Sequence, residues 1–154
     1  MKIEKITIRK FKKNKDTLYN QIWELLKDEK TTEENKLYAN QVIMNMETFI
    51  KDNTAIIYTI SDEEEIDGFI WAYIIKDSSS VAHINYFYIK PQYRSMGYGT
   101  TLLNKIIEEL KKLDCSKVNL YVKKSNINGY KFYEKKGFKQ IKEKKDRLFL
   151  EKVV

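Results

Sequence analysis

A short loop with two glycines places the strongest constraint on how this chain folds. The loop, Arg94-Ser95-Met96-Gly97-Tyr98-Gly99, follows an apolar run at 84–89 that is closed by Lys90-Pro91. After the loop, apolar residues recur at the 3.6-residue spacing of one helix face. These residues are Leu102, Leu103, Ile106, Ile107, Leu110 and Leu113. A glycine loop between a strand and a helix leaves backbone N–H groups free at the positive end of the helix dipole, so the pattern predicts a cradle for a phosphate group.

The residues after the loop exclude two common phosphate-binding motifs. The dinucleotide fingerprint needs a third glycine three residues after Gly99, and that position is Leu102. The nucleoside-triphosphate loop ends in Gly-Lys followed by Ser or Thr, and this ending is missing from the sequence. What remains is an Arg-x-x-Gly-x-Gly loop that follows a strand ending in proline.

A second block lies downstream of this loop. Residues 118–122 alternate between apolar and polar as a half-buried strand does. Ser125-Asn126 comes next, followed by Tyr130-Lys131-Phe132-Tyr133-Glu134-Lys135-Lys136-Gly137-Phe138. The two blocks, in this order and at this separation, resemble the GNAT N-acetyltransferase superfamily over about residues 81 to 140. The resemblance implies an acyl-CoA cofactor, acetyl-CoA. We expect no metal site, because a single cysteine leaves no thiol-rich ligand set.

The expected cofactor site combines the free N–H groups of the loop with residues that the resemblance adds. The resemblance implies that main-chain groups of the strand before the loop bind the pantetheine arm, and that Asn126 contacts the same arm, with Asn128 as an alternative. Arg94 has two possible roles, to add charge near the phosphates or to order the loop. The alternative role of Asn126 or Asn128 is to cap the next helix. The expected residues are Phe87, Tyr88, Ile89, Arg94, Ser95, Met96, Gly97, Tyr98, Gly99, Thr100 and Asn126.

The resemblance also assigns a catalytic residue. It implies that Tyr133 acts as the general acid that protonates the departing thiolate, the alternative being an aromatic core residue. Some relatives carry a glutamate base on the strand before the loop, where this chain has Asn85. An amide does not accept a proton at neutral pH. His83, two residues earlier on the same strand face, and bulk water are the remaining candidates for the base.

Three functions follow as hypotheses. The first is transfer of an acetyl group to the primary amine of a small molecule or peptide. The second is a catalytically silent acyl-CoA-binding module, which Asn85 favours. The third is nucleic-acid binding, which the net charge of +7 suggests, although the lysines are interleaved with acids along the whole chain. The run at 85–89 and the turn at 91–94 resemble polyamine acetyltransferases, whereas a positive chain exerts no general attraction on a polycation.

Composition sets the remaining expectations. A chain of 154 residues with 42% hydrophobic residues predicts one domain over 1–154. A single cysteine, Cys115, excludes an internal disulfide and predicts a packing residue. No apolar run reaches membrane-spanning length and the N-terminus lacks a signal-peptide segment, so we expect a cytoplasmic protein without a membrane partner. An exposed sheet edge near the C-terminus is a candidate site for pairing into a homodimer.

The patterns predict an α/β fold, with a central, mixed, mostly antiparallel and twisted sheet of about six to seven strands flanked by about four helices. A capping box at 31–34 begins a helix whose expected buried stripe is Tyr38, Val42, Met46 and Phe49. Asp67-Gly68 is expected to form a turn. The expected strands are 3–9, 54–60, 69–75, 82–89, 118–122, 139–144 and 147–152. Of the four expected helices, one follows Asp16, one follows Thr31, and two cover 98–113 and 128–136. An acidic turn is expected at 61–67 and a polar loop at 76–80.

Overall fold

The computed structural model describes residues 1–28, 30–75 and 80–154. It confirms the mixed α/β class, with a seven-stranded, mostly antiparallel sheet in the order β1-β2-β3-β4-β5-β7-β6. The elements are β1 (Lys2–Lys5), α1 (Ile8–Lys13), α2 (Lys15–Leu26), α3 (Thr32–Asp52), β2 (Ile56–Asp62), β3 (Glu65–Ile74), β4 (Val81–Ile89), a 3-10 turn (Pro91–Tyr93), α4 (Tyr98–Lys112), β5 (Lys117–Lys123), α5 (Ile127–Lys135), β6 (Lys139–Lys144) and β7 (Arg147–Val153).

Contacts group the chain into two compact units. Unit 1 contains Met1–Trp71 and Tyr86–Ile106, and unit 2 contains Ala72–Asn85 and Ile107–Val154. Strands β3 and β4 and helix α4 each contribute to both units. The expectation of a single domain stays a prediction.

The N-terminal segment departs from the expected strand at 3–9. Strand β1 ends at Lys5, and helix α1 begins at Ile8. The Thr7 hydroxyl accepts a hydrogen bond from the backbone N–H of Lys10 at 3.1 Å and so caps the helix. The alternating isoleucines concealed this cap, because Ile3, Ile6 and Ile8 fit a strand period as well as a helix start.

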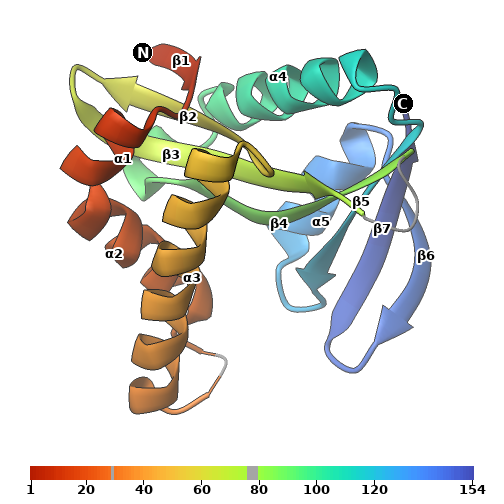
Figure 1. Ribbon diagram of the computed structural model, residues 1–154. Coiled ribbons are helices and arrows are strands. Elements are labelled where there is room, and N and C mark those ends of the chain that lie inside the picture. Colours follow the sequence, from red (N-terminus) through yellow and green to blue (C-terminus); the bar gives the residue numbers. More distant parts are fainter. Residues whose placement is uncertain (29, 76–79) are drawn as a thin grey trace. The chain divides into compact units, whose positions relative to one another are not determined.

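Helices α2 and α3 lie side by side (Figure 1). Thr31 caps α3 by accepting from the backbone N–H of Glu34 at 3.2 Å, as the capping box predicts. The buried stripe differs from the expectation, because Tyr38 is 53% exposed and Phe49 is 38% exposed. The buried positions are Asn35, Ala39, Val42 and Met46.

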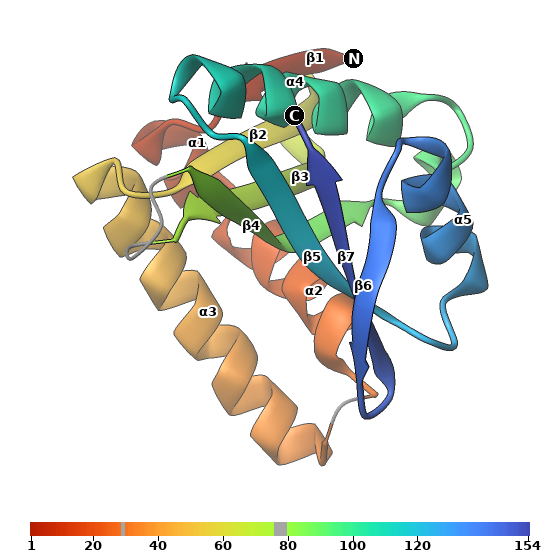
Figure 2. The same ribbon diagram turned by 90° about the vertical axis from the view of Figure 1, so that its right-hand side faces the viewer.

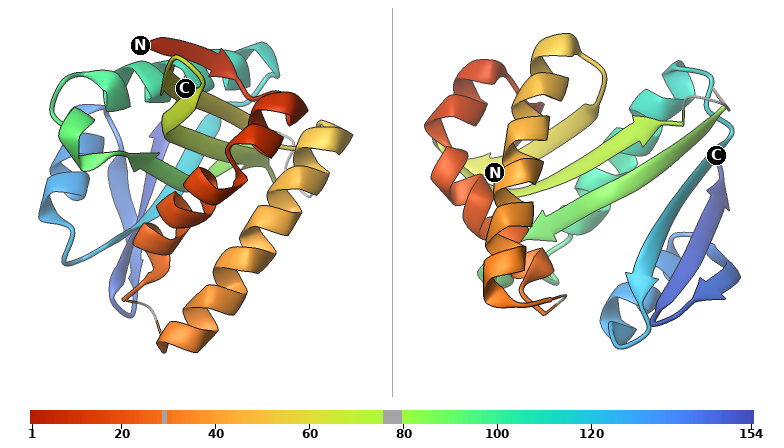
Figure 3. Two further views of the ribbon diagram at one scale, coloured as in Figure 1. Left: turned by 90° about the vertical axis from the view of Figure 1, so that its left-hand side faces the viewer. Right: turned by 60° about the horizontal axis from the view of Figure 1, so that its bottom comes forward.

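The core of unit 1 lies between these helices and the strands (Figure 3, left). Phe11, Leu18 and Ile22 from the first two helices pack in one cluster with Phe69 and Trp71 of β3. Each of these side chains is almost completely buried. Burial of apolar surface of this kind is the main favourable contribution to folding.

The expected turn at Asp67-Gly68 and the extent of the expected acidic turn are wrong. Strand β2 runs to Asp62 and β3 starts at Glu65, so only two residues form the hairpin tip. Gly68 lies within β3, where an added Cβ would come within 2.6 Å of the Tyr88 carbonyl oxygen. The close approach of two backbones therefore requires glycine here.

Gly68→Ala should lower the free energy of unfolding by about 2 kcal/mol, because the new methyl group meets backbone that has no room to move. Urea denaturation followed by circular dichroism measures this loss. Gly129→Ala is the comparison, because the atoms nearest to its added Cβ belong to the Asn126 side chain, which can rotate, and not to backbone. Equal stability of Gly68→Ala and the parent protein would contradict the close approach.

Strand β5 lies between β4 and β7 in unit 2. It pairs with β4 in parallel, with His83 opposite Asn119, and with β7 antiparallel, with Tyr121 opposite Phe149. Figure 2 shows β5, β7 and β6 running side by side. All six residues of β6 are exposed, and the strand carries three lysines and an irregularity at 140–142. Lysines and bulges are features that protect a sheet edge from pairing, so the homodimer stays a prediction.

The remaining expected elements agree with the structure closely. Strand β4, helix α4 and the two C-terminal strands lie within a residue or two of their expected bounds. Leu113 is an exception, since it follows α4 and is exposed. Cys115 is buried, as expected of a packing residue. The expected polar loop falls largely on 76–79, outside the described residues. Among the helices described, none combines the length and the apolar character needed to cross a membrane.

Candidate active site

The glycine loop connects the end of β4 with the start of α4 in unit 1. After the 3-10 turn the backbone takes left-handed conformations at Ser95 (φ 61°) and Gly97 (φ 89°). The first helical hydrogen bond runs from the N–H of Thr101 to the carbonyl of Gly97 at 3.1 Å. The first three N–H groups of α4 therefore have no partner within the helix. Because glycine tolerates a positive φ, this reversal of the chain is unstrained at Gly97.

The N–H groups of the loop itself also point to a ligand. Over the described ranges of the chain, no hydrogen bond uses the backbone N–H of Ser95, Met96 or Gly97. Ser95, Met96 and Gly97 are exposed, and apart from the chain neighbours no atom lies within 4 Å of the position that a Cβ of Gly97 would take. Successive free donors at a helix N-terminus suit an anion. The structure thus brings the predicted loop residues together as an exposed row of donors.

Arg94 orders this loop. Its Nε donates to the Ile89 carbonyl at 2.7 Å, and its guanidinium lies over the Tyr88 ring at 5.4 Å from the centroid. The side chain is exposed, so its charge also faces solvent beside the loop. Of the two roles expected for Arg94, the structure supports ordering of the loop. The contact with phosphate stays a prediction.

Tyr133 lies on α5 in unit 2, among aromatic neighbours. Its ring centroid is 5.3 Å from that of Phe132 and 5.6 Å from that of Phe138. Burial raises the pKa of the Tyr133 hydroxyl above its ordinary value. A tyrosine hydroxyl is protonated at neutral pH even at its ordinary pKa, so Tyr133 carries the proton that a donor needs.

Asn126 occupies the N-cap of α5. Its Oδ1 accepts from the backbone N–H of Gly129 at 2.9 Å. This is the capping role that was expected as the alternative to a pantetheine contact. The Asn126 side chain is exposed, so the cofactor contact stays a prediction, as does that of Asn128.

His83 lies on β4 in unit 2, between residues from the two neighbouring strands. Its Nδ1 is 2.6 Å from Oδ1 of Asn119, and its ring lies 5.6 Å from Tyr73 and 5.8 Å from Tyr121. Burial lowers the pKa of His83, and the hydrogen bond with Asn119 opposes this change only in part. Sequence reasoning missed these three neighbours, because the register that aligns β3, β4 and β5 is not visible in the sequence.

Asn85 follows His83 on the same face of β4. Its Oδ1 is buried and has no hydrogen-bond partner among the residues that the structure describes. An unsatisfied buried acceptor costs about 1–3 kcal/mol. Such an atom calls for a donor that the described residues do not supply.

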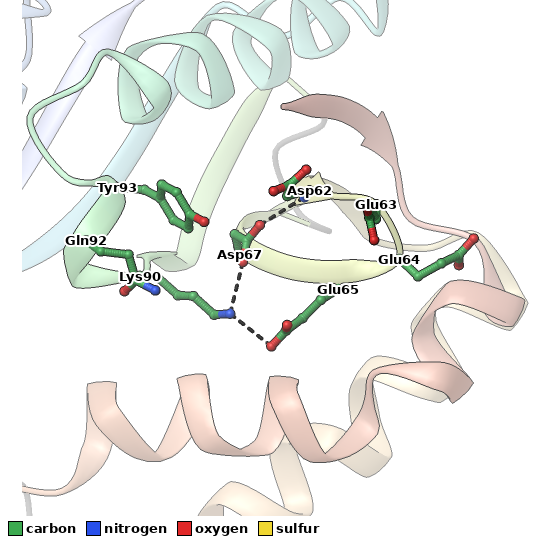
Figure 4. Close-up of a pocket in the computed structure, with 8 residues that line it drawn as sticks. All are labelled: Asp62, Glu63, Glu64, Glu65, Asp67, Lys90, Gln92 and Tyr93. Carbon is green, nitrogen blue, oxygen red and sulfur yellow. Dashed lines mark hydrogen bonds and ion pairs between the residues drawn. The ribbon is translucent and has the colours of Figure 1, made fainter.

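A hollow of about 510 Å³ lies at the β2–β3 hairpin in unit 1 (Figure 4). Lys90 binds Asp67 and Glu65 there, each at 2.9 Å, and Asp67 also accepts from the backbone N–H of Asp62. Burial acts to lower the pKa of Lys90, but the two carboxylates outweigh it and raise the pKa. The residues lining the hollow are Asp62, Glu63, Glu64, Glu65, Asp67, Lys90, Gln92 and Tyr93. None of the predicted cofactor residues lines it.

Comparisons with known proteins show the family to which the chain belongs. A model of the GNAT acetyltransferase family matches residues 17–138. Two curated relatives are a spermidine N(1)-acetyltransferase of Thermoplasma acidophilum, 31% identical over 66% of this chain, and an uncharacterized N-acetyltransferase of Methanocaldococcus jannaschii, 36% identical over 42% of it. The matched regions span 62% and 28% of the lengths of these relatives, respectively.

Solved structures share the fold over the whole chain. The crystal structure of the PaiA N-acetyltransferase from T. acidophilum in complex with coenzyme A has a TM-score of 0.81 at 22% identity, and each chain is covered completely. The structure of an aminoglycoside 6'-acetyltransferase type Ii has a TM-score of 0.73 at 20% identity, covering 99% of this chain and 97% of that one. At these identities the likeness establishes the fold.

Proposed function

Because the chain belongs to the GNAT acetyltransferase family, we propose that it transfers an acetyl group from acetyl-CoA to a primary amine of a small molecule or peptide. The observation that supports this most strongly is the row of free N–H groups from Ser95 to Thr100 at the start of α4. These donors match the charge of a pyrophosphate. Acetyl-CoA supplies an activated thioester when it is bound.

The residues of unit 1 have a binding role in this proposal. The N–H groups of the loop hold the pyrophosphate, and Arg94 keeps the loop in place through Ile89. Main-chain groups of Phe87, Tyr88 and Ile89 hold the pantetheine arm. Positioning the thioester in this way converts a bimolecular encounter into a reaction within one complex.

Proton transfer is the contribution of unit 2. The acceptor amine must lose a proton before its lone pair attacks, and the departing thiolate must gain one. Tyr133 is the proposed donor to the thiolate, because the family resemblance assigns it this role and its hydroxyl is protonated at neutral pH. Asn126 at the start of α5 is the proposed contact for the pantetheine arm.

Polyamines are one acceptor class that the relatives suggest, since one of them is a spermidine N(1)-acetyltransferase. The acidic hollow at the β2–β3 hairpin offers carboxylates to a polycation, although Lys90 already binds two of them. A catalytically silent acyl-CoA-binding module is the second candidate. Asn85 favours it, because an amide stands where some relatives carry a glutamate base.

A thiol-release assay separates the two candidates. The purified protein is mixed with acetyl-CoA and, in turn, with spermidine, an aminoglycoside and a peptide with a free N-terminus. We expect coenzyme A release that depends on one of these amines and saturates with its concentration. Tight acetyl-CoA binding without release in the presence of any of them would favour the silent module.

A further inference from the structure

His83 and Asn119 form a fixed pair across the parallel strands β4 and β5. They are Cα partners in the register, and Nδ1 of His83 lies 2.6 Å from Oδ1 of Asn119. With Oδ1 of Asn119 facing the ring, this contact is a hydrogen bond in the tautomer that carries its proton on Nδ1, and Nε2 of that tautomer keeps its lone pair. In the described part of the chain, no hydrogen bond uses Nε2.

Asn85 places a second acceptor on the same strand face. Side chains two residues apart on a strand point the same way and lie about 6.6 Å apart along it. The Asn85 Oδ1 is buried without a partner in the described ranges, and Nε2 of His83 is also free to accept. Two acceptors without donors on one strand face fit a ligand that carries several N–H groups, and an ammonium is such a ligand.

The surroundings of His83 are aromatic and uncharged. Tyr73 on β3 is 40% exposed and Tyr121 on β5 is 37% exposed, and their rings flank the imidazole. The nearest acid in the strand register is Glu151, which lies opposite Asn119 and pairs with Lys117 at 3.9 Å. The hydrogen bond and the ring contacts of His83 in the described residues thus involve one amide and two phenol rings. Aromatic faces also attract a cation.

We propose that His83 and Asn85 receive the acceptor amine and that Nε2 of His83 is its proton acceptor, an inference that rests on the proposed acetyl transfer. An N–H bond of the ammonium breaks, the electron pair stays on nitrogen, and the proton moves to Nε2. The nitrogen then forms the amide bond to the acetyl carbon while the carbon–sulfur bond breaks. The second nitrogen proton is released as the thiolate gains one, and the imidazolium returns its proton to solvent. Asn119 is a positioning residue that holds the tautomer.

The protein contains one histidine, so an NMR spectrum of the ¹⁵N-labelled imidazole reports on His83 alone. We expect Nδ1 protonated and Nε2 unprotonated at neutral pH, and a shift of the Nε2 signal when a productive amine is added. This readout requires no turnover. A spectrum showing the proton on Nε2 would overturn the inference even if the protein transfers acetyl groups.

Variants give a second test. His83→Gln should lower kcat/KM on the order of 10²-fold without changing the dissociation constant of acetyl-CoA. The imidazole must be neutral to act, so kcat/KM of the parent falls as pH drops through the pKa of His83. Asn119→Asp places a carboxylate at Nδ1, raises that pKa, and should move the acid limb of the profile to higher pH. Lys142→Gln on β6 is the control and should leave both the rate and the profile unchanged.

The outcomes separate this inference from the proposed function. Absence of transfer by the parent protein with every amine overturns both. Transfer by the parent together with parental rate and pH profile in His83→Gln overturns the role of His83 alone. A fall in rate with an acid limb that does not move in Asn119→Asp contradicts proton transfer through the imidazole.

Discussion

Replacing Gly97 and Gly99 with aspartate should weaken acetyl-CoA binding on the order of 10²-fold or more. The two carboxylates would stand beside the free N–H groups that begin α4 and would repel the pyrophosphate. At about 4 Å each pair of like charges costs about 1 kcal/mol in water and about 4 kcal/mol near a protein surface. Two such pairs therefore account for a loss of this size.

Calorimetric titration of acetyl-CoA measures this loss directly. The matched control is Gly97→Asn with Gly99→Asn, because asparagine has the size of aspartate, tolerates a positive φ and carries no charge. We expect the asparagine variant to bind more tightly than the aspartate variant. Equal binding by the aspartate variant and the parent protein would show that the loop does not hold the cofactor.

Tyr133→Phe should reduce kcat on the order of 10²-fold while leaving acetyl-CoA affinity nearly unchanged. The substitution removes the proposed proton donor, and it retains the ring packed near Phe132 and Phe138. General acid catalysis typically contributes a factor of this size. Steady-state kinetics with a productive amine, combined with calorimetry, separate the catalytic loss from a binding loss.

The control for this substitution lies on the same helix. Tyr130→Phe removes a hydroxyl one turn earlier on α5 and should keep the parental kcat. A Tyr133→Phe protein with full activity would leave Tyr133 as a packing residue and assign protonation of the thiolate to solvent. A loss that appears equally in both variants would indicate a structural effect on α5.

The sequence predicted best those elements whose signals are local. The loop at 94–99 and the helix after it follow from glycine spacing and apolar periodicity, and both match the structure. The Thr31 cap follows from the capping box and is observed. Each of these features depends on residues within a few positions of one another.

Other features depend on contacts between distant segments, which the sequence does not reveal. Gly68 was expected in a turn, but it is required by the Tyr88 carbonyl from a neighbouring strand. Tyr38 and Phe49 were expected in the core, but the face of α3 that is buried runs through Asn35 and Ala39. The pairing of His83 with Asn119 depends on a parallel register that joins residues 36 positions apart.

Transfer of an isotopically labelled acetyl group tests the central proposal most directly. The protein would be incubated with ¹³C-acetyl-CoA and each amine of the panel, and the products examined by mass spectrometry together with the amount of free thiol. We expect one amine to gain a single labelled acetyl group for each coenzyme A released, with the product absent from the double-aspartate variant. Thiol release without a labelled amine, or no release with any amine, would contradict acetyl transfer.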